Sequence, residues 1–338
     1  MVETARPTHP GPGETGPAEI GLLLYPGAQA AAIHGLTDLF RVANLVATGE
    51  DESRPAPLRI SHWEAADGAA APTRVFDTAP DAAGAPVAIV APPSLGASPT
   101  PELSAALAPW LAARHDAGAT LASVCAGAFV IAGTGLLDGR TATTHWALED
   151  EFRTRFPRVD LAIDKLIVDD GDILTAGGLM AWTDLGLRLV DRLLGPELMI
   201  ETARYLLIDP PGREQRYYSP FSPRLDHRDA AILKVQHWLQ GNGARGVTLA
   251  AMAACAGLEA RTFLRRFQKA TGLKPTDYCQ RLRIGRARSL LEVGGTTIEQ
   301  IAWAVGYEDA GAFRKVFQRI TGLTPGDYRR RFAPHAAP

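Results

Sequence analysis

The chain has 338 residues, enough for two domains of ordinary size and too many for one ordinary core. Apolar residues make up 46% and charged residues 21%, a globular balance that excludes wholesale disorder. No apolar run reaches the roughly 18 residues of a transmembrane helix, and three widely spaced cysteines exclude a disulfide framework or a Cys-rich zinc site. We therefore expect a cytoplasmic protein with no metal and no other cofactor.

The net charge of -2 hides a strong asymmetry along the chain. Residues 224–338 hold 19 Lys and Arg against 9 Asp and Glu, a net charge of +10. The first 223 residues hold 16 basic and 28 acidic residues, a net charge of -12. Because Lys and Arg that neutralise phosphates release condensed counterions, the basic part is a candidate for binding nucleic acid.

The first two thirds of the chain alternate between strand and helix patterns from Ile20 onwards. Short apolar or alternating runs predict strands at residues 20–25, 58–63, 86–91, 120–124, 165–170 and 173–176. Helical spacing predicts helices at residues 33–47, 101–117, 126–137, 180–194 and 197–207. This alternation predicts an α/β flavodoxin-like, doubly wound parallel sheet, in which ligands bind at the carboxyl ends of the strands.

Composition divides the chain into four predicted parts. Residues 1–19, polar and rich in Pro and Gly, predict a disordered leader, and residues 20–208 the α/β domain. Residues 209–224 contain four prolines and no periodicity, which predicts a linker. Residues 225–333 read as an all-α domain.

The all-α domain contains an internal repeat. FLRRFQKATGLKPTDY at residues 263–278 returns as FRKVFQRITGLTPGDY at residues 313–328, an offset of 50 residues. Each unit reads as a short helix, a turn at Gly257 or Gly306, and a second helix with two Phe residues on its buried stripe. This predicts two helix-turn-helix units with basic side chains on the open face of each second helix. A solvated cationic face of a helical bundle is the alternative, but two tandem basic units favour DNA binding.

The motif RFQKATGLKPTDYCQRLRIGRARSLLE, followed by TIEQIAWAVGYEDAGAFRKVFQRITGLTPGDYRRRF, resembles the DNA-binding domain of AraC/XylS-type transcription regulators. The resemblance covers residues 232–332 and implies that the two second helices enter successive major grooves. It places base-edge contacts on Arg261, Leu264, Arg265, Gly311, Arg314 and Lys315, and the basic residues Arg266, Lys269 and Arg319 flank them. Leu264 and Gly311 lack the polar side chains that base reading needs, although Leu264 could contact a thymine methyl group.

In the α/β domain, TLASV-Cys125-AGAFVIAG reads as a strand, a sharp turn and a helix. A residue at such a turn sits above the sheet, as in a nucleophile elbow, and the following amides and helix N-terminus are expected to lower the thiol pKa. We accordingly expect Cys125 to be more reactive than Cys255 or Cys279. His145 lies in TATTHW, where a crossover connection could bring it to Cys125. Spacing alone favours the alternative that Cys125 is a small buried residue and His145 an ordinary loop-end histidine.

The motif ASVCAGAFVIAGTGLLDGRTATTHW, followed by LTAGGLMAWTDLGLRLV, resembles the PfpI-like domain of the class I glutamine amidotransferase-like superfamily. In such enzymes a Cys nucleophile and a His partner act with an acid on the first helix, roles that fall on Cys125, His145 and Ala32. Ala32 cannot hold a proton, and Pro92 and Pro93 stand where the amides of an oxyanion site are expected. We therefore expect the domain to sense a ligand rather than to catalyse a reaction.

Together the two domains resemble GlxA-type transcriptional regulators. This implies a homodimer, formed through residues 20–208, that binds double-stranded DNA and a small-molecule effector. It also implies an activator that recruits RNA polymerase and is located in the cytoplasm, on the nucleoid. The expected effector-site residues are Cys125, His145, Trp146, Thr175, Trp182 and Asp184, although core packing is the favoured interpretation of each of the last four taken singly. Two alternatives remain: a Cys/His hydrolase or hydratase acting on a small amide or isonitrile, and a redox sensor that works through Cys125.

Overall fold

The structure is a computed structural model that describes residues 16–49, 51, 53–65, 71–210, 212 and 214–333. It divides into two compact units, residues 1–215 and residues 216–338. The division falls within the segment 209–224 that the sequence predicts as the linker. Most of the predicted leader lies outside the described residues, and the first strand already begins at Ala18. No helix in the described part of the chain is long and apolar enough to cross a bilayer.

The N-terminal unit is built on a sheet whose strand order is β3-β2-β1-β4-β5-β9-β8. The strands are β1 (Ala18–Leu24), β2 (Leu58–Glu64), β3 (Thr73–Asp77), β4 (Ala88–Ala91), β5 (Thr120–Val124), β8 (Ile167–Asp169) and β9 (Ile173–Ala176). The five inner strands are parallel, whereas β3 and β8 pair antiparallel at the two edges. The inner order is that of a flavodoxin-like doubly wound sheet, which confirms the predicted fold class.

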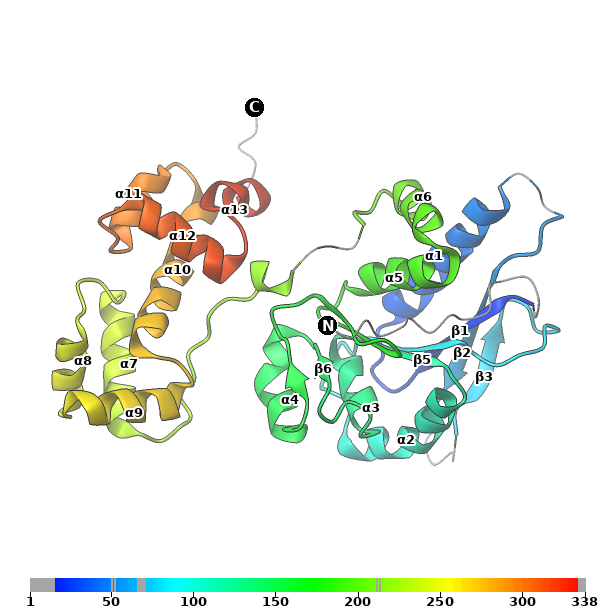
Figure 1. The fold of residues 1–338 in the computed structure, drawn as a ribbon, viewed down its shortest axis with the longest axis horizontal. Helices are drawn as coiled ribbons and strands as arrows, with labels where there is room; N and C mark the ends of the chain where they lie inside the picture. The colour runs from blue at the N-terminus through cyan, green and yellow to red at the C-terminus, as the bar shows by residue number, and fades with distance from the viewer. Residues whose placement is uncertain are drawn as a thin grey trace, which may run out of the picture. The chain divides into compact units, whose positions relative to one another are not determined.

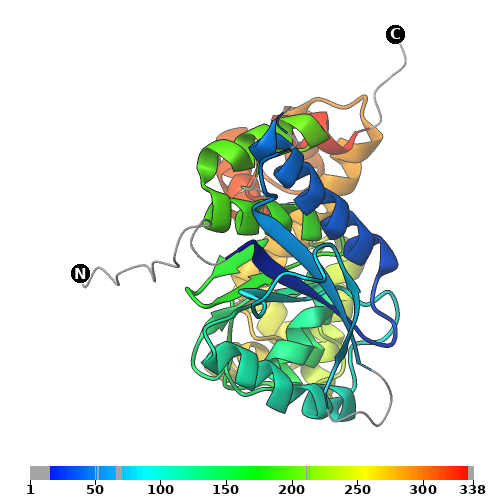
Figure 2. The same ribbon diagram turned by 90° about the vertical axis from the view of Figure 1, so that its right-hand side faces the viewer.

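Helices cover both faces of this sheet (Figures 1 and 2). On one face lie α1 (Ala30–Thr48), α5 (Trp182–Leu194) and α6 (Pro196–Leu206), and on the other α2 (Pro101–Asp116) and α3 (Ala128–Ala132). Shorter elements connect them: β6 (Thr141–Ala142), α4 (Glu149–Arg155) and β7 (Asp160–Leu161). Each face therefore has its own apolar core, as a sheet buried on both sides requires.

The turn after β5 differs from its prediction. The sequence predicts one helix over residues 126–137, but the chain first makes a short 3-10 turn at Cys125–Gly127, and α3 ends at Ala132. Gly127 explains the tight turn, because a Cβ there would lie 2.2 Å from the carbonyl oxygen of Ala91 at the end of β4. The glycine lets the turn press directly against the neighbouring strand.

All described regular elements of the C-terminal unit are helices, beginning with a short 3-10 helix at Gln215–Tyr217 whose first residue belongs to the N-terminal unit. They are α7 (Ala230–Asn242), α8 (Leu249–Ala256), α9 (Ala260–Thr271), α10 (Pro275–Val293), α11 (Ile298–Ala304), α12 (Ala310–Thr321) and α13 (Pro325–Phe332). The repeat becomes two helix-turn-helix units, α8–α9 and α11–α12, each with its own core around a buried Phe pair. The long helix α10 contributes to both cores and joins the units.

The buried phenylalanines should control the stability of the C-terminal unit. Phe267 is fully buried on α9, so Phe267→Ala should lower the free energy of unfolding by about 3–5 kcal/mol through lost burial and a cavity. Leu264→Ala on the same helix is the control, because Leu264 is 39% exposed and should change it by less than about 1 kcal/mol. Hydrogen exchange of amides in α9 measures both values, and equal effects would contradict the assigned core.

Candidate functional site

Cys125 occupies the turn between β5 and α3, at the carboxyl ends of the parallel strands. Its backbone has φ of 55°, in the left-handed region that non-glycine residues rarely adopt, and its side chain is only 3% exposed. The backbone N–H groups of Ala126 and Gly178 both contact the thiol. The predicted elbow geometry is therefore present, with the thiol enclosed by protein.

The electrostatics of the thiol contradict the sequence-based expectation. Burial raises the pKa of Cys125 to about 11, and the two amide contacts only partly offset this effect. The nearby Tyr25 phenol, whose pKa is raised mainly by burial, adds no positive charge. The prediction of a lowered thiol pKa was wrong because it counted the helix N-terminus and not the loss of solvent around the sulfur.

His145 does not serve Cys125 in this structure. Its Nδ1 accepts a hydrogen bond from the backbone N–H of Ala147 at 3.1 Å, and burial lowers its pKa, which favours the neutral imidazole. No hydrogen bond joins the imidazole to the thiol among the described residues. The adjacent Thr144 makes the contact with the turn instead, because its Oγ1 donates to the carbonyl oxygen of Cys125 at 2.8 Å.

The positions where related enzymes would need an acid and amide donors are also inert. Ala32 is fully buried in the first turns of α1 and has no proton-bearing group. After β4, the carbonyl oxygens of Pro92 and Pro93 accept hydrogen bonds from the Tyr25 hydroxyl and the Gln29 amide, respectively. This loop presents acceptors where an oxyanion site needs donors.

The other predicted effector-site residues fall into two groups. Thr175 on β9 accepts a hydrogen bond from the Thr143 amide at 2.8 Å, which ties β9 to the segment that contains His145 and Trp146. Trp182 and Asp184 lie at the start of α5. The Trp182 ring packs where a Cβ on Gly35 would stand 2.4 Å away, and the Asp184 carboxylate accepts from the Thr183 hydroxyl at 3.2 Å.

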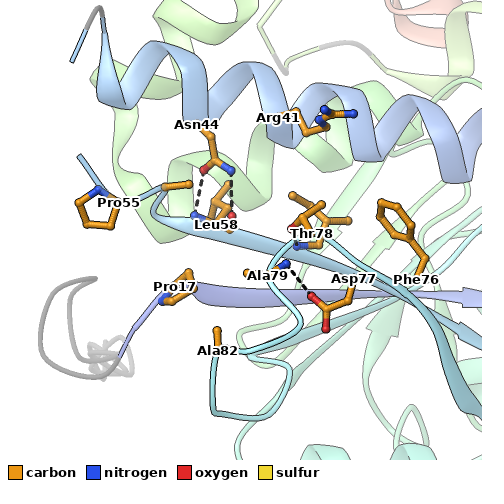
Figure 3. A pocket seen from close by; sticks show the side chains of 12 residues that line it. Pro17, Arg41, Asn44, Pro55, Leu58, Phe76, Asp77, Thr78, Ala79 and Ala82 are labelled. Carbon is orange, nitrogen blue, oxygen red and sulfur yellow. Dashed lines mark hydrogen bonds between the residues drawn. The ribbon is translucent and has the colours of Figure 1, made fainter. Parts of the chain in front are cut away.

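A cavity of about 660 Å³ lies elsewhere, between α1 and the β2–β3 edge of the sheet (Figure 3). Arg41 and Asn44 reach it from α1, and Leu58 and Phe76 line it from the two strands. Asn44 is fixed by hydrogen bonds to the backbone N–H and carbonyl of Leu58. None of the predicted effector-site residues lines this cavity.

Sequence reasoning missed a buried glutamine beside the turn. Gln215 is 2% exposed, and its side chain bonds to the backbone of Trp146 and Thr144. It stands in a proline-rich, aperiodic segment, where nothing in the sequence indicates burial. The paired glycines Gly177 and Gly178 after β9 are a detectable signal, because adjacent glycines indicate close backbone approach.

In the C-terminal unit, the second helix of the first helix-turn-helix unit carries an open basic stripe. Arg261, Arg265 and Lys269 are exposed and spaced four residues apart, and Leu264 lies among them with 39% exposure. None of these three cations forms an ion pair with any described residue. Arg266 points elsewhere, because its guanidinium makes a bidentate pair with Asp229, the N-cap of α7.

On α12, the second helix of the other unit, more of the polar groups are already bonded to residues of the same chain. Arg314 pairs with Glu299 of α11, and Arg319 donates to the Gln280 side chain at 2.6 Å. The Gly311 amide donates to Asp309, which caps α12. Lys315 is exposed and has no ion-pair partner among the described residues. The two units therefore offer unequal basic surfaces.

The pKa of Cys125 predicts how it reacts. At pH 7 only about one thiol in ten thousand is ionised when the pKa is about 11, so the half-buried Cys255 should react with iodoacetamide before Cys125. The Cys125 rate should rise about tenfold per pH unit from pH 8 to 10, which mass spectrometry of the labelled peptides measures. Selective labelling of Cys125 at neutral pH would contradict this assignment.

Two family models match the chain. Residues 83–192 match the DJ-1/PfpI family, and residues 252–331 match a helix-turn-helix domain. These segments contain Cys125 with its turn and most of the two helix-turn-helix units.

Among curated proteins, the chain is similar to two HTH-type transcriptional regulators of Pseudomonas aeruginosa. CdhR is 27% identical over 64% of this chain and 65% of that protein, and ArgR is 31% identical over 58% of this chain and 60% of that protein. An isonitrile hydratase of Pseudomonas putida is 35% identical over 30% of this chain and 39% of that protein. The chain thus spans less than two thirds of the length of each of these relatives. Its two units are a DJ-1/PfpI-family domain and an AraC-type helix-turn-helix domain.

Proposed function

We propose that the chain is a sequence-specific DNA-binding transcription regulator controlled through its N-terminal domain. The observation that carries this proposal is the exposed stripe of Arg261, Arg265 and Lys269 on the second helix of a helix-turn-helix unit, repeated in basic character on α12. Such a helix fits a major groove, where Arg bonds guanine edges and Lys neutralises phosphates. The likeness to named transcriptional regulators supports the same function.

Control by a small-molecule effector belongs to the same proposal. We place the effector at the Cys125 turn, with His145, Trp146, Thr175, Trp182 and Asp184 as its neighbours, because ligands of doubly wound sheets bind at this edge. The enclosed thiol requires that these neighbours move apart when the effector enters. Cys125→Ala should keep DNA binding and change the effector response.

An enzymatic function is the second candidate, supported by the likeness to an isonitrile hydratase. Three features weigh against this function. Ala32 offers no proton donor, the loop of Pro92 and Pro93 presents carbonyl acceptors in place of oxyanion donors, and the high pKa of Cys125 disfavours the thiolate. Many turnovers on a small amide or isonitrile, lost in Cys125→Ala, would replace the sensor proposal. A redox sensor has less support, since Cys255 and Cys279 belong to the other unit.

The assembly and its location complete the proposal. We propose a homodimer through residues 20–208, which would give two DNA-binding domains and two half-sites. As an activator it would contact RNA polymerase at the promoter, in the cytoplasm and on the nucleoid. Sedimentation of the full chain tests the assembly, and a monomer at micromolar concentration with and without DNA would overturn it.

DNA binding should depend on salt and on the α9 stripe. The full chain should bind duplex DNA at low salt, and its affinity should fall steeply as salt rises because cations on the protein displace counterions. On a site selected from random duplexes, Arg265→Ala should cost about 1–3 kcal/mol and relax base preference at one position.

Fluorescence anisotropy with labelled duplexes measures these affinities. Gln240→Ala is the matched control, because Gln240 is exposed on α7, outside the α9 and α12 surfaces, and should leave the affinity unchanged. Absence of binding at low salt would sink the proposal. Equal effects of Arg265→Ala on selected and random duplexes would remove Arg265 from base reading.

A further inference from the structure

Gln215 is held in the N-terminal unit by hydrogen bonds from its side-chain amide and its backbone N–H. Its Oε1 accepts from the Trp146 amide at 2.7 Å, and its Nε2 donates to the carbonyl oxygens of Thr144 and Ile163, both at 2.9 Å. Its own backbone N–H donates to the Asp164 carbonyl at 3.1 Å. A buried primary amide with these partners is expensive to leave unpaired, so the side chain is held firmly.

The Gln215 slot, formed by residues 143–146, 163–165 and Gly177, shares two of its walls with the cysteine turn. A Cβ on Gly177 would lie 2.3 Å from Gln215 Nε2, and the N–H of the next residue, Gly178, contacts the Cys125 thiol. The Thr144 carbonyl accepts from Gln215 while its hydroxyl donates to the Cys125 carbonyl. A change at Cys125 that moves either wall therefore also disturbs Gln215.

The very next residues are fixed within the C-terminal unit. The guanidinium of Arg288, which is 8% exposed, donates to the carbonyl oxygens of Arg216, at 2.8 Å, and Ser219. Arg288 belongs to α10, the helix that joins the two helix-turn-helix units, and lies 5.4 Å from the Tyr328 ring centroid. At Gly322, the C-cap of α12, a Cβ would stand 2.5 Å from Arg216 Nε.

The two anchors are consecutive in sequence. Gln215 is the last residue of the N-terminal unit and Arg216 is the first residue of the C-terminal unit, so a single peptide bond joins the two anchors without a flexible residue between them. A displacement of the Gln215 backbone therefore reaches Arg216 directly, and Arg216 is itself held against α10 and the end of α12. Slack would let the two anchors move independently, because a flexible insert absorbs displacement.

We propose that Gln215 is the coupling residue of the regulator: displacement of the Gln215 slot by a change at the Cys125 turn is transmitted through the Gln215–Arg216 bond to the segment under α10. This inference rests on the proposed control through the N-terminal domain and names its route. Gln215 is a positioning residue, since it touches the walls of the site and not the thiol.

The first experiment tests the anchor in the full chain. Gln215→Ala removes the amide, and Gln215→Glu places a carboxylate against three backbone carbonyl oxygens, including that of Lys165. Both variants should speed hydrogen exchange of the Trp146 amide and alkylation of Cys125 at pH 9 by about tenfold or more. Gln240→Ala is the matched control. Rates within twofold of wild type in both variants would overturn the anchor.

The second experiment tests the coupling with iodoacetamide as the probe. Wild type alkylated at Cys125 at high pH and returned to pH 7.5 should show at least threefold faster exchange of amides at residues 216–219. A variant with Gly-Ser-Gly-Ser inserted between Gln215 and Arg216 keeps both anchors, so Trp146 should stay protected while alkylation no longer changes residues 216–219. Cys125→Ala, treated identically, subtracts the effects of labelling Cys255 and Cys279.

Two outcomes would contradict the coupling: no change at residues 216–219 in alkylated wild type, or the same change in the insertion variant. DNA affinity is measured on the same samples. A wild type that binds no DNA would overturn the proposed function, whereas the exchange of residues 216–219 would still decide the coupling. The two failures are therefore distinguishable.

Discussion

The close approach of the Cys125–Gly127 turn to the end of β4 is the constraint around which the N-terminal unit is organised. With hydrogen in place of a side chain at Gly127, the turn reaches the carbonyl oxygens of Ala91 and Pro92, and Cys125 within the turn has a positive φ. The Thr144 hydroxyl donates to the Cys125 carbonyl oxygen, and the Gly178 amide contacts the buried thiol. The same enclosure raises the pKa of the thiol, which favours its neutral form at pH 7.

Most of the architecture could be predicted from the sequence, because the signals are local. Buried apolar runs indicated β1, β4, β5 and β9, and their alternation with helices fixed the parallel sheet. The strand β3 was missed since most of its residues are exposed at the sheet edge, without an apolar run. The two-residue strands β6 and β7 are too short to carry a pattern.

The site was predicted less completely, because its chemistry depends on partners distant in sequence. The pKa of Cys125 is decided by burial, which no spacing reports. Asp229, 37 positions away, neutralises Arg266, and Gln280, 39 positions away, holds the Arg319 side chain by a hydrogen bond, so the basic sequence alone did not show which cations are free. Gln215 finds its partners 50 to 71 positions upstream, and the sequence around it indicates only a connecting segment.

The two helix-turn-helix units consequently differ in what they offer to DNA. The stripe on α9 is free of ion pairs within the described residues, whereas on α12 Arg314 must leave Glu299 before it can meet a base, and Asp309 places a carboxylate at the helix N-terminus. Carboxylates near a groove-facing helix end repel phosphates, which weakens that unit's electrostatic contribution. Sequence repetition thus does not imply equal roles for the two helices.

The central claim is that this chain recognises particular DNA sites. Genome-wide footprinting of the full chain in its own cells tests it most directly, with a variant that carries Arg261→Ala and Arg265→Ala as comparison. The account predicts a limited set of protected sites upstream of genes, sharing a common sequence and lost in the variant. Protection spread evenly over the genome, or identical footprints in the variant, would contradict it.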